Sequence, residues 1–245
     1  MKMLKTLIRI CQVLLIVVIV WSGYKMFSTY QQDKKAEARY TELQRKYTTI
    51  QTGTKEVRPQ FEQLEQHNED IIGWINLPGT PLNYPILQGE DNKEYLHEDF
   101  EHEESRKGSV FMDYRNDVAN PSYNTVIYGH HVGDGSMFDT VEKYLDQSFY
   151  DQHPTLQYDT KYGKYQLEVL SAYQTTTEDY YIQTDFDNEA AYDQFLKQTM
   201  KKSQINTNTT VDKSDKIVTL STCEDAFRPT SGRIVVVAKL VEAHE

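Results

Sequence analysis

The residues with the clearest potential for chemistry lie near the C-terminal end of the sequence, in the segment IVTLSTCEDAFRPTSGRIVVVAKL. This segment contains Cys223, and the only other cysteine, Cys11, lies inside an apolar run near the N-terminus. Arg233 follows Cys223 by ten positions, at the start of the last apolar run. An arginine beside a thiol favours the thiolate and can also stabilise a developing oxyanion. The pair predicts a cysteine nucleophile, and the alternative is a small, buried cysteine with no chemical role.

Two strands are expected to bring Cys223 and Arg233 together. KIVTLSTC is typical of a strand that ends at the thiol, RIVVVAKLV is typical of a strand that runs back, and a nine-residue loop joins them. If these strands pair as neighbours, their adjoining ends lie at the same edge of a sheet, within side-chain reach. Arg233 could instead be a charge that protects an edge strand. Arg228, in the loop, is a rival partner for the thiol.

A cysteine nucleophile needs a proton-transfer partner, and the adjacent pair His130 and His131 is the best candidate among seven histidines. The pair ends the expected strand NTVIYGHH. Successive residues of a strand point to opposite faces, so one of the two can face Cys223, and spacing alone does not choose between them. The same opposition makes the pair a poor chelate, so we expect no metal and no cofactor.

The charge of the chain argues against nucleic acid as a partner. The formal net charge is −11 over 245 residues, and the first 30 residues carry four basic side chains and no acidic one. The remainder is therefore strongly acidic, whereas phosphate binding needs clustered lysine and arginine. The hydrophobic content of 38% is sufficient for a sizeable core.

An apolar, uncharged run at residues 10–24, ICQVLLIVVIVWSGY, predicts a membrane anchor. Trp21 and Tyr24 suit a membrane interface, and the basic residues before the run favour a cytoplasmic N-terminus. A cleaved signal peptide is the alternative. Because the bulky end of the run, WSGYKMF, offers no small-residue cleavage site, we expect the anchor to stay attached.

Three segments are expected along the chain. Residues 1–30 form a cytoplasmic tip and transmembrane anchor, residues 31–70 form a helical stalk with further N-terminal helices, and residues 71–245 form the catalytic domain. The stalk segment contains a polar helix over residues 31–51 and a helix over residues 58–72. The last segment alternates seven or eight short strands with helices at residues 137–150 and 188–203, which predicts a mainly antiparallel barrel or sandwich.

The motif TLSTC, followed ten residues later by Arg233 and preceded by IYGHH and an N-terminal anchor, resembles the sortase family. The double histidine, the helix MFDTVEKYL and the helix at residues 187–202 resemble class B sortases in particular. The resemblance covers the whole chain and implies an eight-stranded sortase β-barrel with decorating helices. It also implies a membrane-anchored cysteine transpeptidase with Cys223 as nucleophile, His130 as catalytic histidine, and Arg233 as the residue that stabilises the oxyanion or positions the substrate.

The resemblance further implies the partners of this enzyme. Sortases cleave a sorting signal near the C-terminus of secreted proteins, after its threonine, and transfer the acyl group to an amine of a peptidoglycan precursor. Class B members favour signals of the Asn-Pro-Gln-Thr-Asn type, often on proteins of haem-iron acquisition. The implied substrate groove contains Asn92, Leu96, Thr177, Tyr181, Ile182, Ser221 and Glu224.

Three alternatives stay open at this point. The enzyme could be a thiol protease that only hydrolyses, and the chain could be a surface binding module without catalysis. Asp225, two residues after the thiol, could orient His130, although we expect it to order the loop as a turn residue.

Overall fold

The structure of the protein, a computed structural model, describes residues 2–49, 59–225 and 231–243. The side chains of residues 2–8, 48–49, 59 and 223–225 lie outside this description. The chain divides into two compact units, Met1–Leu43 and Gln44–Glu245. The three segments expected from the sequence have different boundaries and stay a prediction.

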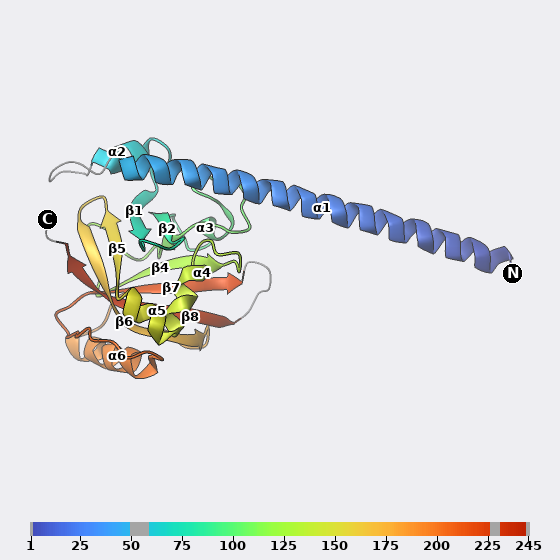
Figure 1. The fold of residues 1–245 in the computed structure, drawn as a ribbon. Helices are drawn as coiled ribbons and strands as arrows, with labels where there is room; N and C mark the ends of the chain where they lie inside the picture. The colour runs from blue at the N-terminus through green and yellow to red at the C-terminus, as the bar shows by residue number, and fades with distance from the viewer. Residues whose placement is uncertain (1, 50–58, 226–230, 244–245) are drawn as a thin grey trace. The chain divides into compact units, whose positions relative to one another are not determined.

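The first unit is part of one long helix, α1 (Lys2–Thr49), which is drawn in blue in Figure 1. Its most apolar stretch has a mean hydropathy of 1.9. In the described part of the chain, α1 is the one helix long and apolar enough to cross a membrane, a test that a signal sequence also meets. The polar helix expected at residues 31–51 is the continuation of this helix as far as Thr49.

The second unit contains a closed barrel with the strand order β1-β2-β3-β4-β7-β8-β6-β5, which confirms the expected eight-stranded fold. The β2–β3 and β4–β7 pairs are parallel, and the other pairs are antiparallel. In Figure 1, β4 and β7 run side by side in the same direction. The strands are β1 (Ile71–Asn76), β2 (Asn83–Leu87), β3 (Phe111–Met112), β4 (Asn124–His131), β5 (Thr155–Thr160), β6 (Lys164–Thr176), β7 (Ile217–Asp225) and β8 (Gly232–Glu242).

Helix α2 (Pro59–Glu65) precedes β1. The helices that follow β1 lie between strands: α3 (Glu94–His97), α4 (Asp139–Glu142), the 3-10 helix η1 (Lys143–Leu145), α5 (Gln147–Gln152) and α6 (Glu189–Lys202). The helix expected over residues 58–72 is too long. Asn68 ends the helical run in a turn, because its backbone N–H donates to Leu64 and its side chain accepts from the N–H of Asp70 at 2.7 Å. The chain then enters β1 at Ile71.

The helix expected over residues 137–150 is divided into three pieces. The break between η1 and α5 follows from Asp146, whose backbone is extended and whose side chain accepts from the N–H of Ser148. An aspartate in this position starts a new helix instead of continuing the previous one. The last predicted helix begins in the same way, since Asn188 caps α6 by accepting from the N–H of Ala191 at 3.0 Å.

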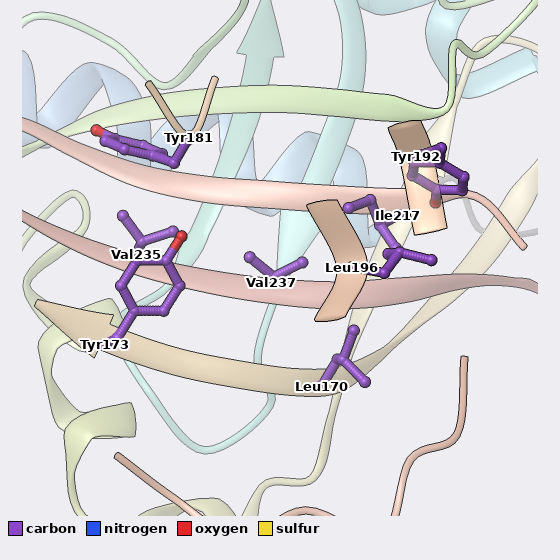
Figure 2. Close-up of a cluster of buried hydrophobic side chains, with 8 residues drawn as sticks. All are labelled: Leu170, Tyr173, Tyr181, Tyr192, Leu196, Ile217, Val235 and Val237. Carbon is purple, nitrogen blue, oxygen red and sulfur yellow. The ribbon is translucent and has the colours of Figure 1, made fainter. Parts of the chain in front are cut away.

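The inner face of α6 forms an apolar cluster with β6, β7, β8 and the segment that follows β6. In Figure 2, Tyr192 and Leu196 of α6 lie beside Ile217 of β7, and Tyr181 lies toward the other end of the cluster. The eight buried members are Leu170, Tyr173, Tyr181, Tyr192, Leu196, Ile217, Val235 and Val237. We call this set the α6 cluster, and it packs against the strands that carry the candidate site.

The last turns of α1 belong to the second unit and pack on the barrel. The ring of Tyr47 stacks on Trp74 with centroids 4.0 Å apart, and its hydroxyl donates to the buried carboxylate of Asp159. Gln44 donates from its side-chain nitrogen to the carbonyl of Asn83 at 2.6 Å. These contacts make residues 44–47 a structural part of the barrel unit.

Candidate active site

Three neighbouring strands bring the expected catalytic residues to one edge of the barrel. β4 pairs with β7 so that Gly129 lies opposite Thr222 and His131 opposite Asp225, with an irregularity between them. The backbone of His130 therefore lies level with that of Cys223 and Glu224.

On the other side of β7, strand β8 brings in Arg233. Ser221 pairs with Val235, and the N–H of Ile234 donates to the side-chain oxygen of Thr222 at 2.9 Å. The paired part of the two strands ends here, and Cys223 lies two residues after Ser221 on β7, as Arg233 lies two residues before Val235 on β8. The predicted pairing of the last two strands is confirmed.

The structure distinguishes the two histidines. His130 is 5% exposed and lines a pocket together with Arg233 and Thr222. The side chain of His131 is 28% exposed, and its Nε2 lies 2.7 Å from a carboxylate oxygen of Glu142. The alternation of the strand therefore directs His130 to the pocket and His131 to the α4 helix.

His130 is held by the main chain of α3. Its Nε2 lies 2.9 Å from the carbonyl oxygen of Leu96. A carbonyl can only accept, so Nε2 carries a hydrogen in this arrangement, and a proton gained or lost by the ring is exchanged at Nδ1. Gly108, with φ of +53°, lies against the same carbonyl, and a Cβ there would come within 2.6 Å of the oxygen. Only glycine fits beside the oxygen that orients His130.

The loop that follows the two histidines is fixed by one carboxylate. Asp139, which is 8% exposed, accepts hydrogen bonds from the backbone N–H groups of Val132, Gly133 and Gly135, at 2.6, 3.0 and 2.6 Å. These bonds satisfy the polar backbone of the turn after β4, and they hold the end of the strand in place.

The pocket beside His130 has a volume of about 410 Å³. It contains six of the seven residues expected in the substrate groove, from three separate parts of the chain: Asn92, Leu96, Thr177, Tyr181, Ile182 and Ser221. The side chains of the seventh, Glu224, and of Cys223 and Asp225 lie outside the described residues, and so does the loop residue Arg228.

Six further pocket residues were missed by the sequence analysis: His97, Phe111, Tyr128, Asp179, Tyr180 and Thr222. Tyr128 could have been found, because alternation places it on the same face of its strand as His130. Phe111 lies on a strand of two residues, whose pairing is too short to leave a periodic signal. His97 and Tyr180 lie in the helix and loop segments that border the pocket, where no sequence period applies.

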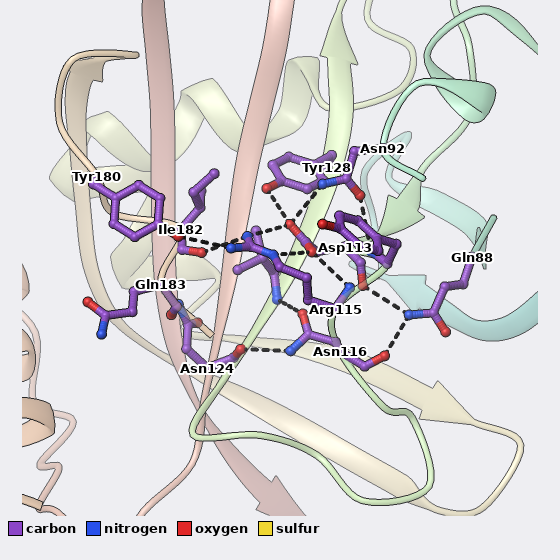
Figure 3. A network of polar contacts seen from close by, with 12 residues as sticks. Gln88, Asn92, Asp113, Arg115, Asn116, Asn124, Tyr128, Tyr180, Ile182 and Gln183 are labelled. Atoms are coloured by element: carbon purple, nitrogen blue, oxygen red, sulfur yellow. Dashed lines mark hydrogen bonds and ion pairs between the residues drawn. The ribbon is translucent and has the colours of Figure 1, made fainter. Parts of the chain in front are cut away.

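An ion pair between a buried aspartate and a partly exposed arginine, which the sequence did not indicate, lies behind the pocket wall (Figure 3). Asp113 and Arg115 make a two-point contact, with Nε to Oδ1 at 2.8 Å and an Nη to Oδ2 at 2.7 Å. Burial alone would raise the pKa of the Asp113 carboxyl, but the hydrogen bonds from Arg115, Tyr128 and Asn92 outweigh it and lower that pKa below its usual value. Asp113 is therefore an anion at neutral pH, and the same pairing raises the pKa of Arg115.

Glu94, Glu98 and His102 are the one group in the described part of the chain whose donor atoms could hold a metal ion. Their ligand atoms lie within 4.8 Å of one another, and the His102 side chain is half exposed. Carboxylates at a surface commonly gather without an ion, so we assign no metal to this group.

Comparison with known proteins gives one consistent family. The model of the sortase domain matches residues 75–241. Sortase B of Staphylococcus aureus is 55% identical over 240 residues, 98% of each chain. Sortase B of Listeria monocytogenes is 37% identical over 227 residues, 91% of this chain and 92% of that protein.

Solved structures agree with the sequence matches. The structure of a Staphylococcus aureus sortase B–substrate complex has a TM-score of 0.84 and 55% identity, and the match covers 87% of this chain and all of that one. Sortase B from B. anthracis in complex with AAEK2 has a TM-score of 0.79 and 45% identity, over 86% of this chain and 98% of that one. With the barrel order and the convergence of three strand ends described above, these matches lead to one conclusion: the chain belongs to the sortase family, and it is a class B sortase, a cysteine transpeptidase.

Proposed function

We propose that this sortase cleaves a C-terminal sorting signal of the Asn-Pro-Gln-Thr-Asn type after its threonine and transfers the protein to an amine of a peptidoglycan precursor. The observation that carries the proposal is that His130 and Arg233 line one pocket at the end of the strand that contains Cys223. Six residues expected to contact the signal line the same pocket. A relative 55% identical in sequence has been solved as a substrate complex.

The first half of the reaction is acylation of Cys223. Its thiolate sulfur attacks the carbonyl carbon of the threonine, and the bond from that carbon to the next nitrogen breaks. The leaving amine takes a proton from His130, and a thioester remains on the enzyme. In the second half, an incoming amine attacks the thioester, its proton returns to His130, and the thiolate leaves.

His130 is suited to this exchange because its two nitrogens have separate tasks. Nε2 donates to the Leu96 carbonyl, which fixes the ring, and the proton that moves is therefore the one on Nδ1. Arg233 is the candidate for stabilising the oxyanion on the threonine carbonyl. Its guanidinium donates to the carbonyl of Gly232 at 2.7 Å, which anchors it at the start of β8.

The apolar part of α1 is proposed to be the membrane anchor, with the N-terminus in the cytoplasm and the barrel on the outer face. The length and hydropathy of α1 support a membrane span. The basic residues before the apolar run support the orientation. An enzyme that joins secreted proteins to a cell-wall precursor needs this location. Proteins of haem-iron acquisition are the proposed natural substrates.

Product analysis tests the proposal. The full-length protein is incubated with a peptide containing Asn-Pro-Gln-Thr-Asn, with and without triglycine, and the products are identified by mass spectrometry. We expect cleavage between threonine and the second asparagine, and a new Thr–Gly bond when triglycine is present. A solved structure of a related sortase B complexed with triglycine supports this choice of amine. Hydrolysis alone, unchanged by the amine, would contradict transpeptidation of this signal.

Cys223→Ala and Arg233→Lys are the matched variants. Cys223→Ala removes the nucleophile, so we expect no cleavage. Arg233→Lys keeps the charge but loses the planar guanidinium, so we expect a decrease in kcat of about 100-fold, as for the loss of one oxyanion donor. Full activity of Arg233→Lys would exclude a two-point contact as the role of Arg233.

A further inference from the structure

We propose that Arg115 is a positioning residue for the sorting peptide, holding the wall of the pocket from behind through the ion pair with Asp113. The inference rests on the proposed function, because it assigns the pocket to the peptide. Asp113 and Arg115 contact four pocket residues, and those four come from three separate segments of the chain: Asn92, Tyr128, Tyr180 and Ile182.

Asp113 gathers two of the three segments. Its side chain has no exposed surface, and its Oδ2 accepts from the Tyr128 hydroxyl at 2.8 Å and from the Asn92 side-chain nitrogen at 2.9 Å. The carbonyl oxygen of the Asn92 side chain in turn accepts from the N–H of Tyr114 at 3.0 Å. The Asn92 amide is therefore held at both ends, and its orientation in the pocket depends on Asp113.

Arg115 extends the same network to the third segment, the loop between β6 and α6. One Nη donates to the Tyr180 hydroxyl and the other to the Ile182 carbonyl, both at 2.9 Å. In Figure 3 the guanidinium lies between Asp113 on one side and Tyr180 and Ile182 on the other. The planar guanidinium can contact the Asp113 carboxylate and the loop at the same time. A lysine ammonium at this position would lose some of these hydrogen bonds.

The catalytic residues are held by other contacts. His130 is oriented by the Leu96 carbonyl, and the end of β7 is joined to β8 through Thr222 and Ile234. Loss of Arg115 therefore removes the hydrogen bonds to Tyr180 and to the Ile182 carbonyl, while the α6 cluster still holds Tyr181 and the proton-transfer residues stay in place. The expected consequence is weaker peptide binding with little change in the chemical step.

Kinetics of Arg115→Lys with the Asn-Pro-Gln-Thr-Asn peptide and triglycine test this inference in the full-length protein. We expect KM for the peptide to rise about tenfold, the size of one lost charge-assisted hydrogen bond, and kcat to stay within about twofold. Tyr180→Phe removes one hydroxyl contact with Arg115, and we expect a smaller rise in KM of about threefold. In the double variant Arg115→Lys/Tyr180→Phe, the two effects should not add, because both remove the same contact.

Two controls separate positioning from general damage. Lys197→Ala removes an exposed ion pair with Asp193 on α6 and should leave KM and kcat unchanged. The reaction of Cys223 with a small methanethiosulfonate reagent does not need the peptide wall, so its rate should be unchanged in Arg115→Lys.

Unchanged KM in Arg115→Lys, or a fall in kcat at constant KM, would overturn the inference. If Arg115→Lys does not fold, the KM of Tyr180→Phe decides in the same way.

Direct binding separates this inference from the proposed reaction. The affinity of a fluorescent signal peptide is measured by anisotropy with Cys223→Ala and with Cys223→Ala/Arg115→Lys. A wild-type protein that binds the peptide without cleaving it would contradict the proposed function. In that case, a tenfold weaker affinity of Cys223→Ala/Arg115→Lys than of Cys223→Ala would still support the role of Arg115. Equal affinities would overturn the role of Arg115, and no binding by Cys223→Ala would overturn both.

Discussion

Two regions hold the same pocket wall by different physical means. The α6 cluster is apolar and includes Tyr181, whereas the network around Asp113 is polar and reaches Tyr180 and Ile182 (Figures 2 and 3). Of three consecutive residues of one loop, Tyr181 belongs to the cluster, Tyr180 contacts the network, and Ile182 takes part in both, because its side chain packs against the cluster and its carbonyl accepts from Arg115.

The difference between the regions follows from the nature of the two forces. Packing gives stability in proportion to buried area and does not define direction. Charge-assisted hydrogen bonds contribute less to folding, but they fix distance and angle. We infer that the α6 cluster keeps the loop on the barrel and that the Asp113 network sets its position within the pocket.

The largest effect is expected in the α6 cluster. Tyr192 is fully buried, with ring centroids 4.6 Å from Tyr123 and 5.0 Å from Phe186. Tyr192→Ala should lower the free energy of unfolding by about 3–5 kcal/mol, because it removes an aromatic ring and leaves a cavity. Urea unfolding measures the loss. Tyr162→Ala is the matched control, since this ring is 58% exposed, and its cost should stay below about 0.5 kcal/mol. Equal losses of unfolding free energy in Tyr192→Ala and Tyr162→Ala would contradict the claim that the α6 cluster stabilises the fold.

The Asp113 network should show a smaller effect with a pH dependence that the cluster lacks. The pKa of Asp113 is lower in the folded protein than its ordinary value of 3.8, so its ion pair stabilises the fold fully above that value and loses this contribution as the pH falls through the folded pKa. Asp113→Asn should therefore cost about 1–3 kcal/mol at pH 7, and the difference from wild type should shrink below pH 3.8.

The measurement is urea unfolding of wild type and Asp113→Asn between pH 7 and pH 2.5. Tyr192→Ala, measured in parallel, should show a deficit that does not change over this range, because the lost contacts are ring packing and hydrogen bonds from the hydroxyl to backbone carbonyls, which do not titrate. A pH-independent deficit in Asp113→Asn would show that the charge of Asp113 does not stabilise the fold.

The smallest effect is expected where the cluster and the site meet. The Tyr181 hydroxyl and the Ser221 hydroxyl are 2.8 Å apart in a buried setting. Tyr181→Phe keeps the ring in the cluster and removes this bond, so it should cost about 1 kcal/mol in unfolding. If Tyr181→Phe destabilised as strongly as Tyr192→Ala, the hydroxyl would matter as much as the packing, and the division between the two regions would fail.

The sequence was sufficient to predict the strands and the residues at their ends. Alternation, turn residues and the motif around Cys223 predicted the last hairpin and the histidine strand but left a barrel or a sandwich open, and the eight-stranded barrel was implied by the resemblance to sortases. All seven predicted groove residues could be named only because the resemblance to sortases supplied them. The residues alone did not decide between His130 and His131, because the decision depends on where β7 lies.

The parallel pairing of β4 and β7 was beyond sequence patterns. The paired residues Asn124 and Ile217 are far apart in the chain, and alternation describes the faces of a strand without naming its neighbour. The network of Asp113 and Arg115 was missed for a related reason. Its polar side chains follow a strand of two residues, in a sequence typical of a solvated turn. Segments distant in the sequence cover these side chains and bind them, which a local pattern does not reveal.

The account depends most on Cys223 as the nucleophile at the edge where His130 and Arg233 meet. The direct measurement is mass spectrometry of the intact protein after brief exposure to the Asn-Pro-Gln-Thr-Asn peptide without amine, followed by proteolysis to find the modified residue. The account predicts an added mass equal to the peptide acyl group up to threonine, on Cys223, sensitive to hydroxylamine and absent in Cys223→Ala. An acyl group on any other residue, or cleavage that persists in Cys223→Ala, would contradict it.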